Sequence, residues 1–226
     1  MKYTDILCDS SSLISLTGSC SSQLLYFFHK KYNIRFLIPP SVEYESVERP
    51  LNMKSRQYAL SALRIKKAIQ DGVVVVIDAK VDKRAQELEK IANNIFFVKG
   101  YPLKIVHTGE MEMIALSEHL GVKNILVDER TTRLISEAPF RYKEHLEKEF
   151  KVVVMLNKKN LLDIKKIVEN MKIIRSSELL ILAYEHGMFD NFNSMKKEFL
   201  EAGLYSLKYS GCSIQSFEID KYLGSI

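Results

Sequence analysis

The chain has 226 residues, of which 46% are hydrophobic and 27% are charged, so it is long enough for one large domain with an appendage and is not disordered as a whole. The formal net charge of +5 permits a nucleic-acid partner without arguing for one. No apolar run is long enough to span a bilayer, and no signal peptide begins the chain, so we expect no membrane partner. Three cysteines without metal-binding spacing indicate a reducing, cytoplasmic location.

Short apolar runs alternate with amphipathic segments through the first 156 residues. The predicted strands are 4–8, 34–38, 73–77, 124–127 and 152–156. The predicted helices are 10–16, 23–31, 82–93, 108–120 and 131–138, with helical periodicity also in 41–47 and within 49–70. This alternation is typical of an α/β fold, in which helices cover both faces of a central, mostly parallel sheet.

Beyond about residue 157 the pattern changes, and no convincing strand appears. Helices are predicted at 161–171, 177–184, 193–200 and 214–223. We therefore expect an α/β domain in residues 1–156 and a helical C-terminal extension, residues 157–226, packed on it.

Four acidic residues stand out by their positions. Asp9 and Asp128 each end an apolar strand, Glu45 follows a strand that is closed by prolines, and Glu110 lies in the first turn of a helix. The carboxyl ends of parallel strands meet at one edge of a sheet, where ligands bind. Carboxylates gathered there repel one another unless cations lie between them, and hard oxygen ligands suit Mg²⁺ or Mn²⁺. Two such ions can activate water and stabilise the leaving oxygen of a phosphodiester.

Each of these residues also has a simpler explanation. Acidic residues in the first turn of a helix complement the helix dipole, which could account for Glu45 and Glu110. Aspartate is common as a helix cap or turn residue after a strand, which covers Asp9 and Asp128. The residues alone leave both explanations open.

The order of these elements resembles that of PIN-domain nucleases, the fold shared by VapC-type toxins and by archaeal and eukaryotic RNA-processing endonucleases. The matching segments are Ile6–Ile14, Ile38–Val47, Gly109–Leu116 and Ile125–Arg130. The resemblance covers about residues 4–156 and implies a PIN-like three-layer fold. In that family, acidic residues at these places bind one or two divalent ions and support metal-dependent cleavage of RNA.

The resemblance implies specific roles for residues of this chain. It assigns the metal site and catalysis to Asp9, Glu45, Glu110 and Asp128. Glu43 also lies in the second acidic segment, but Glu45 has the family's Val-x-x-Glu spacing from Val42. The second-rank candidates are Ser10 and Ser11, which could support the site, and Glu112 and Glu129, which compete with Glu110 and Asp128.

The expected function is therefore a Mg²⁺- or Mn²⁺-dependent endoribonuclease, a hydrolase that acts on RNA phosphodiester bonds. One alternative is the toxin of a toxin–antitoxin pair, held by a small antitoxin; the other is a non-catalytic PIN-like module that binds RNA or protein. Two features argue against a simple toxin. The insertion at about 49–100 is long for a compact toxin, and the segment Ile174–Gly187 is similar to the C-terminal tail of a PIN-like group that is common in archaea and bacteria. The resemblance also allows a homodimer.

A basic stretch follows Glu45 and carries no acidic residue between Arg49 and Gln70. We expect it to contact an RNA backbone, with Tyr58 as a stacking residue. The expected RNA contacts are Arg49, Lys54, Arg56, Arg64, Lys67 and, just after Asp128, Arg130. The alternative is an ordinary solvated helix face whose charges pair with acidic groups elsewhere.

Overall fold

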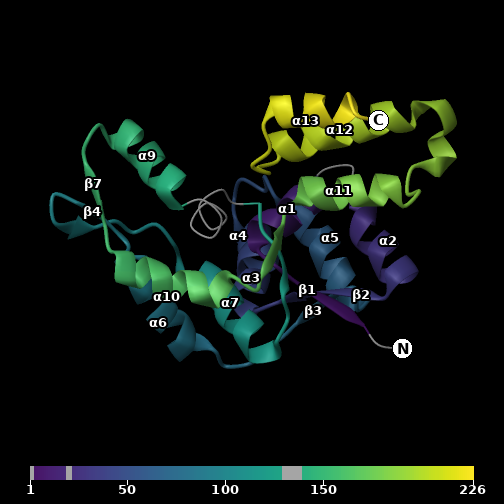
Figure 1. Cartoon of the computed structure of the whole chain (residues 1–226). Coiled ribbons are helices and arrows are strands. Elements are labelled where there is room, and N and C mark those ends of the chain that lie inside the picture. Colours follow the sequence, from purple (N-terminus) through teal and green to yellow (C-terminus); the bar gives the residue numbers. More distant parts are fainter. Residues whose placement is uncertain (1–2, 19–21, 129–138) are drawn as a thin grey trace. The chain divides into compact units, whose positions relative to one another are not determined.

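A computed structural model describes residues 3–18, 22–128 and 139–226 (Figure 1). The chain forms two compact units, each with its own core. The first unit draws its described residues from 1–77, 126–129 and 174–226, and the second from 78–125 and 130–173. This partition follows the packing of the chain; the domain boundary predicted near residue 156 stays a prediction.

The predicted α/β class is confirmed by a five-stranded parallel sheet with the strand order β3-β2-β1-β6-β8. The strands are β1 (Thr4–Cys8), β2 (Ile34–Ile38), β3 (Val74–Val76), β6 (Asn124–Leu126) and β8 (Lys172–Ile174). In the register, Ile6 of β1 lies beside Phe36 of β2, which lies beside Val74 of β3. All three side chains are buried, as expected for parallel strands that are covered on both faces.

Two expectations about strands are wrong. The sequence predicts no strand beyond residue 157, but β8 forms an edge of the parallel sheet. Its only apolar residues are Ile173 and Ile174. The predicted strand at 152–156 forms as β7 (Val154–Leu156), but it pairs antiparallel with β4 (Phe96–Val98) in a separate sheet that also contains β5 (Tyr101–Pro102). Met155 is exposed there, so this strand is not buried on both faces.

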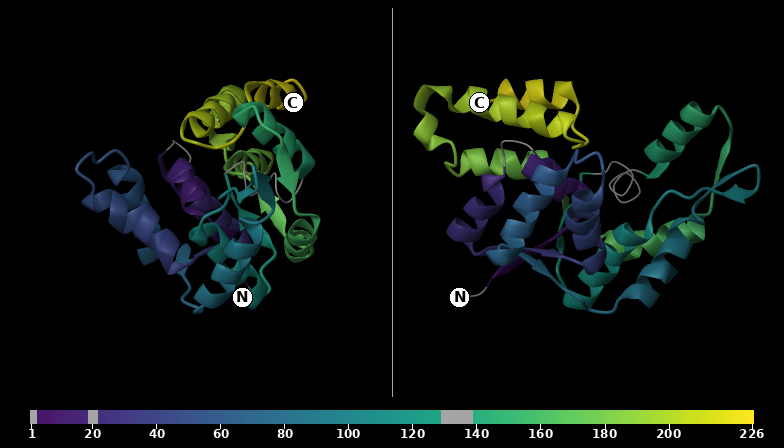
Figure 2. Two further views of the ribbon diagram at one scale, coloured as in Figure 1. Left: turned by 90° about the vertical axis from the view of Figure 1, so that its left-hand side faces the viewer. Right: turned by 180° about the vertical axis from the view of Figure 1, so that it is seen from behind.

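Helices of the first unit come from both ends of the chain. They are α1 (Ser10–Gly18), α2 (Gln23–Tyr32), α3 (Pro40–Glu43), the π-helical turn η1 (Tyr44–Glu48), α4 (Arg49–Asn52), α5 (Ala59–Gln70), α11 (Ser176–Glu185), the 3₁₀ segment η2 (Asp190–Met195), α12 (Lys196–Tyr209) and α13 (Ser216–Leu223). Helices α1 and α5 pack against each other, and α12 lies between α11 and α13 (Figure 2). Proline at the first position of α3 suits a helix start, where its missing N–H is not needed.

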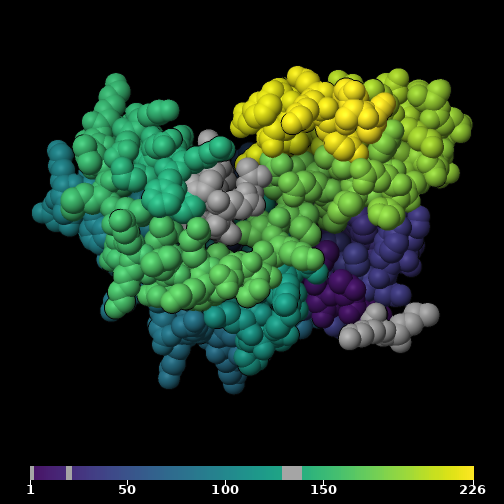
Figure 3. Space-filling model, in the orientation of Figure 1, coloured from purple at the N-terminus to yellow at the C-terminus, as the bar shows by residue number. Residues whose placement is uncertain are grey.

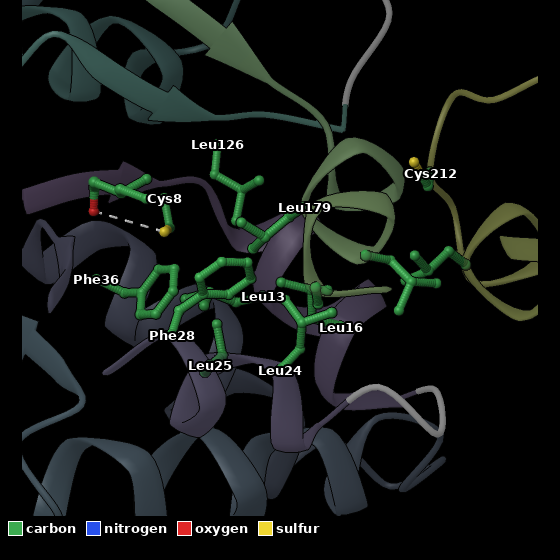
Figure 4. Close-up of a cluster of buried hydrophobic side chains, with 14 of the residues drawn as sticks. Cys8, Leu13, Leu16, Leu24, Leu25, Phe28, Phe36, Leu126, Leu179 and Cys212 are labelled. Carbon is green, nitrogen blue, oxygen red and sulfur yellow. Dashed lines mark hydrogen bonds between the residues drawn. The ribbon is translucent and has the colours of Figure 1, made fainter. Parts of the chain in front are cut away.

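The core of the first unit joins the N-terminal strands and helices to the C-terminal helices. Figure 4 shows Leu13 of α1, Phe28 of α2 and Phe36 of β2 together with Leu126 and Leu179. Helices α12 and α13 add further buried side chains to the same cluster: Leu200, Leu204, Leu207, Ile219 and Leu223. The C-terminal helices therefore complete the core of this unit.

Close packing holds α12 on α11. Gly203 of α12 has no side chain, and a Cβ atom there would lie 2.8 Å from a terminal methyl of Leu180 on α11. The absence of a side chain lets the two helix backbones approach closely. The side chains of α12 and α13 form one continuous surface in the space-filling view (Figure 3).

The second unit has its own apolar cluster around Leu88, Phe96 and Ile114. Its helices are α6 (Asp82–Ala92), α7 (Thr108–Leu120), α9 (Pro139–Phe150) and α10 (Lys158–Val168). The predicted helix at 131–138 lies outside the described residues. In the part of the chain that the structure describes, no helix is both long enough and apolar enough to cross a membrane.

A buried arginine ties the C-terminal helices to the end of the sheet. Arg175 follows β8, and its guanidinium donates to Glu178 at 2.9 Å, to Glu218 of α13 at 3.0 Å and to the carbonyl of Ser213 at 3.2 Å. Because the arginine is buried, these three acceptors offset the free-energy cost of removing its charge from water.

We expect Arg175→Met to lower the free energy of unfolding by about 1–3 kcal/mol, because two glutamates and a carbonyl lose their charged donor. Urea denaturation measures this loss. The matched control is Arg84→Met, since Arg84 also bridges two glutamates, Glu87 and Glu118, but at the surface. Its loss should cost under about 1 kcal/mol. Equal costs for the two variants would show that Arg175 is not a structural hub.

Candidate metal site at the strand ends

Asp9 lies at the carboxyl end of β1 and is 8% exposed. One carboxylate oxygen accepts hydrogen bonds from the backbone N–H of Ser12, at 2.7 Å, and from the Ser12 hydroxyl. The other oxygen accepts from the Ser11 hydroxyl at 2.5 Å. Asp9 thus caps helix α1, the role that the simpler explanation of this residue predicts. Ser11, a second-rank candidate, contacts Asp9 directly.

Asp128 lies two residues beyond β6 and is fully buried. Its Oδ1 atom accepts a hydrogen bond from the backbone N–H of Ser176, at 2.7 Å, at the start of α11. Its Oδ2 atom is buried and has no hydrogen-bond partner in the described chain. A buried carboxylate oxygen without a donor is costly, so this atom needs an explanation.

The two aspartates follow neighbouring strands. The Asp9 backbone N–H donates to the carbonyl of Leu126, at 3.1 Å, at the end of β6. Burial raises the pKa of Asp9 to about 6; hydrogen bonds from Ser11 and Ser12 oppose this rise, and the charge of Asp128 adds to it. Among the described residues, no lysine or arginine forms a salt bridge with either aspartate.

Glu45 is linked to Asp9 through two adjacent serines. It lies on the π-helical turn η1, is exposed, and accepts a hydrogen bond from the Ser10 hydroxyl at 2.8 Å. Ser11, the next residue, bonds to Asp9. The structure therefore connects Asp9 and Glu45 across α1. Single π turns inside helices occur frequently at functional sites.

Glu110 belongs to the second unit, in the first turn of α7. Its carboxylate accepts a hydrogen bond from the backbone N–H of His107, at 2.8 Å, and forms a capping box. A capping box is a structural role, in line with the explanation that Glu110 serves the start of its helix and not a metal ion. Glu112 lies half-buried on the same helix. The roles of both residues as metal ligands stay predictions, and Glu129 and Arg130 lie outside the described residues.

Across residues 3–18, 22–128 and 139–226, no group of three or more acidic, histidine or cysteine side chains is placed so that it could hold one ion. The acids of the first unit are instead two buried aspartates and an exposed glutamate, connected through serines. Carboxylate and hydroxyl oxygens are hard donors, which bind Mg²⁺ or Mn²⁺ in preference to softer metals.

Serines from the C-terminal segment gather near Asp128. The hydroxyl oxygens of Ser176, Ser177 and Ser213 are buried and have no hydrogen-bond partner within the described chain. Cys212 lies beside α11 (Figure 4), and burial, followed by the charge of Asp128, raises the pKa of its thiol to about 12. The sequence prediction misses these serines. For Ser176 and Ser177, the signal is the apolar pair Ile173-Ile174 followed by polar residues, as at Asp9.

The residues of the basic stretch differ in their surroundings. Arg49 and Lys54 are exposed, and Arg56 is exposed but donates a hydrogen bond to the carbonyl of Leu51 at 2.6 Å. Arg64 is half-buried and donates to the carbonyl of Thr17 at 2.6 Å, and Lys67 pairs with Asp71 one helical turn away. Tyr58 is exposed as well. The first part of the stretch is therefore the part that is available to a phosphate backbone.

The raised pKa of Asp9 predicts a pH dependence of stability in metal-free protein. The native state binds the extra proton between pH 4 and 6, so the contribution of Asp9 is most favourable below about pH 4 and falls, by about 3 kcal/mol, as pH rises to about 6. Urea denaturation in the presence of a chelator should show Asp9→Asn gaining stability relative to wild type over this range. A constant difference between the two proteins would contradict the assignment.

Comparison with known proteins does not assign the chain to a family. No protein-family model matches the chain, and neither the curated proteins nor the solved structures contain a match to it.

Proposed function

We propose that this chain is a metal-dependent endoribonuclease with a PIN-like fold, which hydrolyses RNA phosphodiester bonds with Mg²⁺ or Mn²⁺. One observation carries the proposal: Asp9 and Asp128 are both buried at adjacent strand ends, and an oxygen of Asp128 has no partner in the described chain. The resemblance of the four acidic segments to PIN nucleases supports the same conclusion.

The donor set fits such an ion. Among the described residues, no cationic side chain forms a salt bridge with either buried carboxylate, so the two carry negative charge that burial makes costly. A divalent cation offsets that charge and can bind the unpartnered oxygen of Asp128. Asp9, Asp128 and Glu45 would hold the ion, and a role for Glu110 as a ligand stays a prediction of the resemblance.

Divalent ions at such a site make a bound water more acidic and stabilise the leaving oxygen of a phosphodiester. The protein's own contribution is positioning. Ser11 and Ser12 fix both oxygens of Asp9, and Ser10 orients Glu45. Because Glu45 is the exposed member of the three, it is the one that can approach an RNA strand on the surface.

The basic residues that follow Glu45 would bind the RNA backbone. Arg49 lies four residues after Glu45 in a continuous helical segment, so the two side chains share a face. Lys54 and Arg56 extend the positive charge along the exposed stretch that follows. Lysine and arginine contacts to phosphates supply affinity without sequence preference.

A second candidate is a non-catalytic module that binds RNA or protein. It is favoured by the capping role of Glu110 and by the absence of a three-residue metal group among the described residues. Titration calorimetry with Mn²⁺ separates the two, since a module that has lost metal chemistry has no need to bind the ion. A role as the toxin of a toxin–antitoxin pair stays a prediction of the resemblance.

We expect Asp9→Asn to reduce cleavage of a mixed RNA panel in Mn²⁺ at least about a hundredfold, because a central carboxylate ligand becomes a neutral amide. Cleavage is followed by gel electrophoresis of end-labelled RNAs. The matched control is Asp5→Asn, which changes an aspartate at the opposite end of the same strand, paired with Arg35. This variant should keep its activity. Equal activity of Asp9→Asn and wild type would identify the cleavage as a contaminant.

We expect Arg49→Gln combined with Lys54→Gln to weaken RNA binding and to reduce the slope of log affinity against log salt by about 1–2, because two phosphate contacts are lost. Fluorescence anisotropy at several salt concentrations measures this, with Asp9→Asn as the background so that RNA stays intact. Lys67→Gln is the control and should change the slope less, because its ammonium is paired with Asp71. An unchanged slope in the double variant would exclude this surface.

A further inference from the structure

Four buried oxygen atoms of the first unit share one unusual property. Asp128 Oδ2 and the hydroxyl oxygens of Ser176, Ser177 and Ser213 all lack a hydrogen-bond partner in the described chain. Asp128, Ser176 and Ser177 are fully buried residues. Native proteins leave few such atoms unsatisfied, so four in one region need a common cause.

Asp128 is the hub that brings these residues together. Its Oδ1 atom accepts the backbone N–H of Ser176 at 2.7 Å, and its carbonyl accepts the backbone N–H of Ser213 at 3.2 Å. The thiol of Cys212 interacts with both Asp128 and Ser177. Two segments of the C-terminal part, the start of α11 and the loop before α13, thus meet at one residue, Asp128.

The unsatisfied atoms indicate an occupant that the chain itself does not supply. None of the four oxygens bonds to another, although Ser176 and Ser213 bond to Asp128 through their backbone N–H groups and Ser177 lies beside Cys212. Polar groups held slightly too far apart for a direct bond are commonly bridged by a small species between them. Such a species must have several partners, and these four oxygens provide them.

The negative charge of the two buried aspartates favours a cation over a water molecule as the species that these oxygens bind. Asp9 and Asp128 are both buried, and the nearby guanidinium of Arg175 is already shared by Glu178 and Glu218. A water molecule would leave the two aspartates uncompensated, whereas a cation offsets them. The hydroxyls are neutral oxygen donors, which can bind a hard cation or its bound waters.

We infer that the hydroxyls of Ser176, Ser177 and Ser213 complete the metal site on its Asp128 side, directly or through waters bound to the ion. This inference rests on the proposed function and deepens it. It makes the C-terminal segment a component of the site, since that segment delivers three oxygen donors beside Asp128. It also places this part of the ion's surroundings within the first unit alone.

The test measures Mn²⁺ affinity and metal-free stability in the full-length Ser176→Ala/Ser213→Ala double variant. Titration calorimetry should show the dissociation constant for Mn²⁺ rising about tenfold or more, because supporting groups of a metal site are lost. Thermal unfolding in the presence of a chelator should show a melting temperature equal to or above that of wild type. The reason is that the variant removes two buried hydroxyls that have no partner without the ion.

The control is Ser117→Ala, which removes a buried hydroxyl that donates to the carbonyl of Val122 at 2.6 Å. It should lower metal-free stability and leave Mn²⁺ affinity unchanged. Wild-type Mn²⁺ affinity in the double variant would overturn the inference while leaving the proposed function in place. A loss of metal-free stability like that of Ser117→Ala would also overturn it, because the serines would then be structural. Mn²⁺ binding that depends on the serines, without RNA cleavage by wild type, would overturn the proposed function alone.

Discussion

The burial of two carboxylates at adjacent strand ends is the constraint on which the rest of the first unit depends. Asp9 and Asp128 are held by backbone N–H groups at the starts of α1 and α11, so each helix begins where a buried charge needs a donor. Helix N-termini are favourable surroundings for negative charge, because their N–H groups and dipoles point toward it. The two helices and the two strand ends therefore stabilise one another, and a change at either aspartate alters the start of a helix.

A second layer of interactions connects this edge to the C-terminal helices. Arg175 lies between β8 and α11 and reaches Glu218 on α13 as well as the carbonyl of Ser213. The same loop that the arginine holds also carries Cys212 and Ser213, which lie next to Asp128. Charge on the arginine thus positions backbone and hydroxyl groups beside the buried aspartate without contacting it.

Patterns of apolar residues predicted the α/β class and four of the five parallel strands, including those that carry Asp9 and Asp128. They did so because a strand that is covered on both faces must be apolar along its length. β8 escaped prediction because its only apolar residues, Ile173 and Ile174, lie between Lys172 and Arg175, whereas the equally short β3 lies within the apolar run Val73–Ile77. The hydrogen bonds of Glu45 to Ser10 and of Asp128 to Ser176 join residues far apart in the chain, and no local pattern encodes them. Glu110 shows the opposite case, since the sequence already places it in the first turn of a helix, where an acidic residue has a local structural role.

The first unit is assembled from three separate stretches of the chain, and this has a consequence for the order of events during synthesis. Asp9 and Glu45 leave the ribosome before Asp128, which emerges after residues 78–125 of the second unit have been made. The helices that close the core, and the serines beside Asp128, emerge after the second unit. A nascent chain that stops before residue 174 lacks both the closing helices and the groups that surround Asp128. The candidate site can therefore form only after residues 174–226 have been made, which couples any activity to the synthesis of this segment.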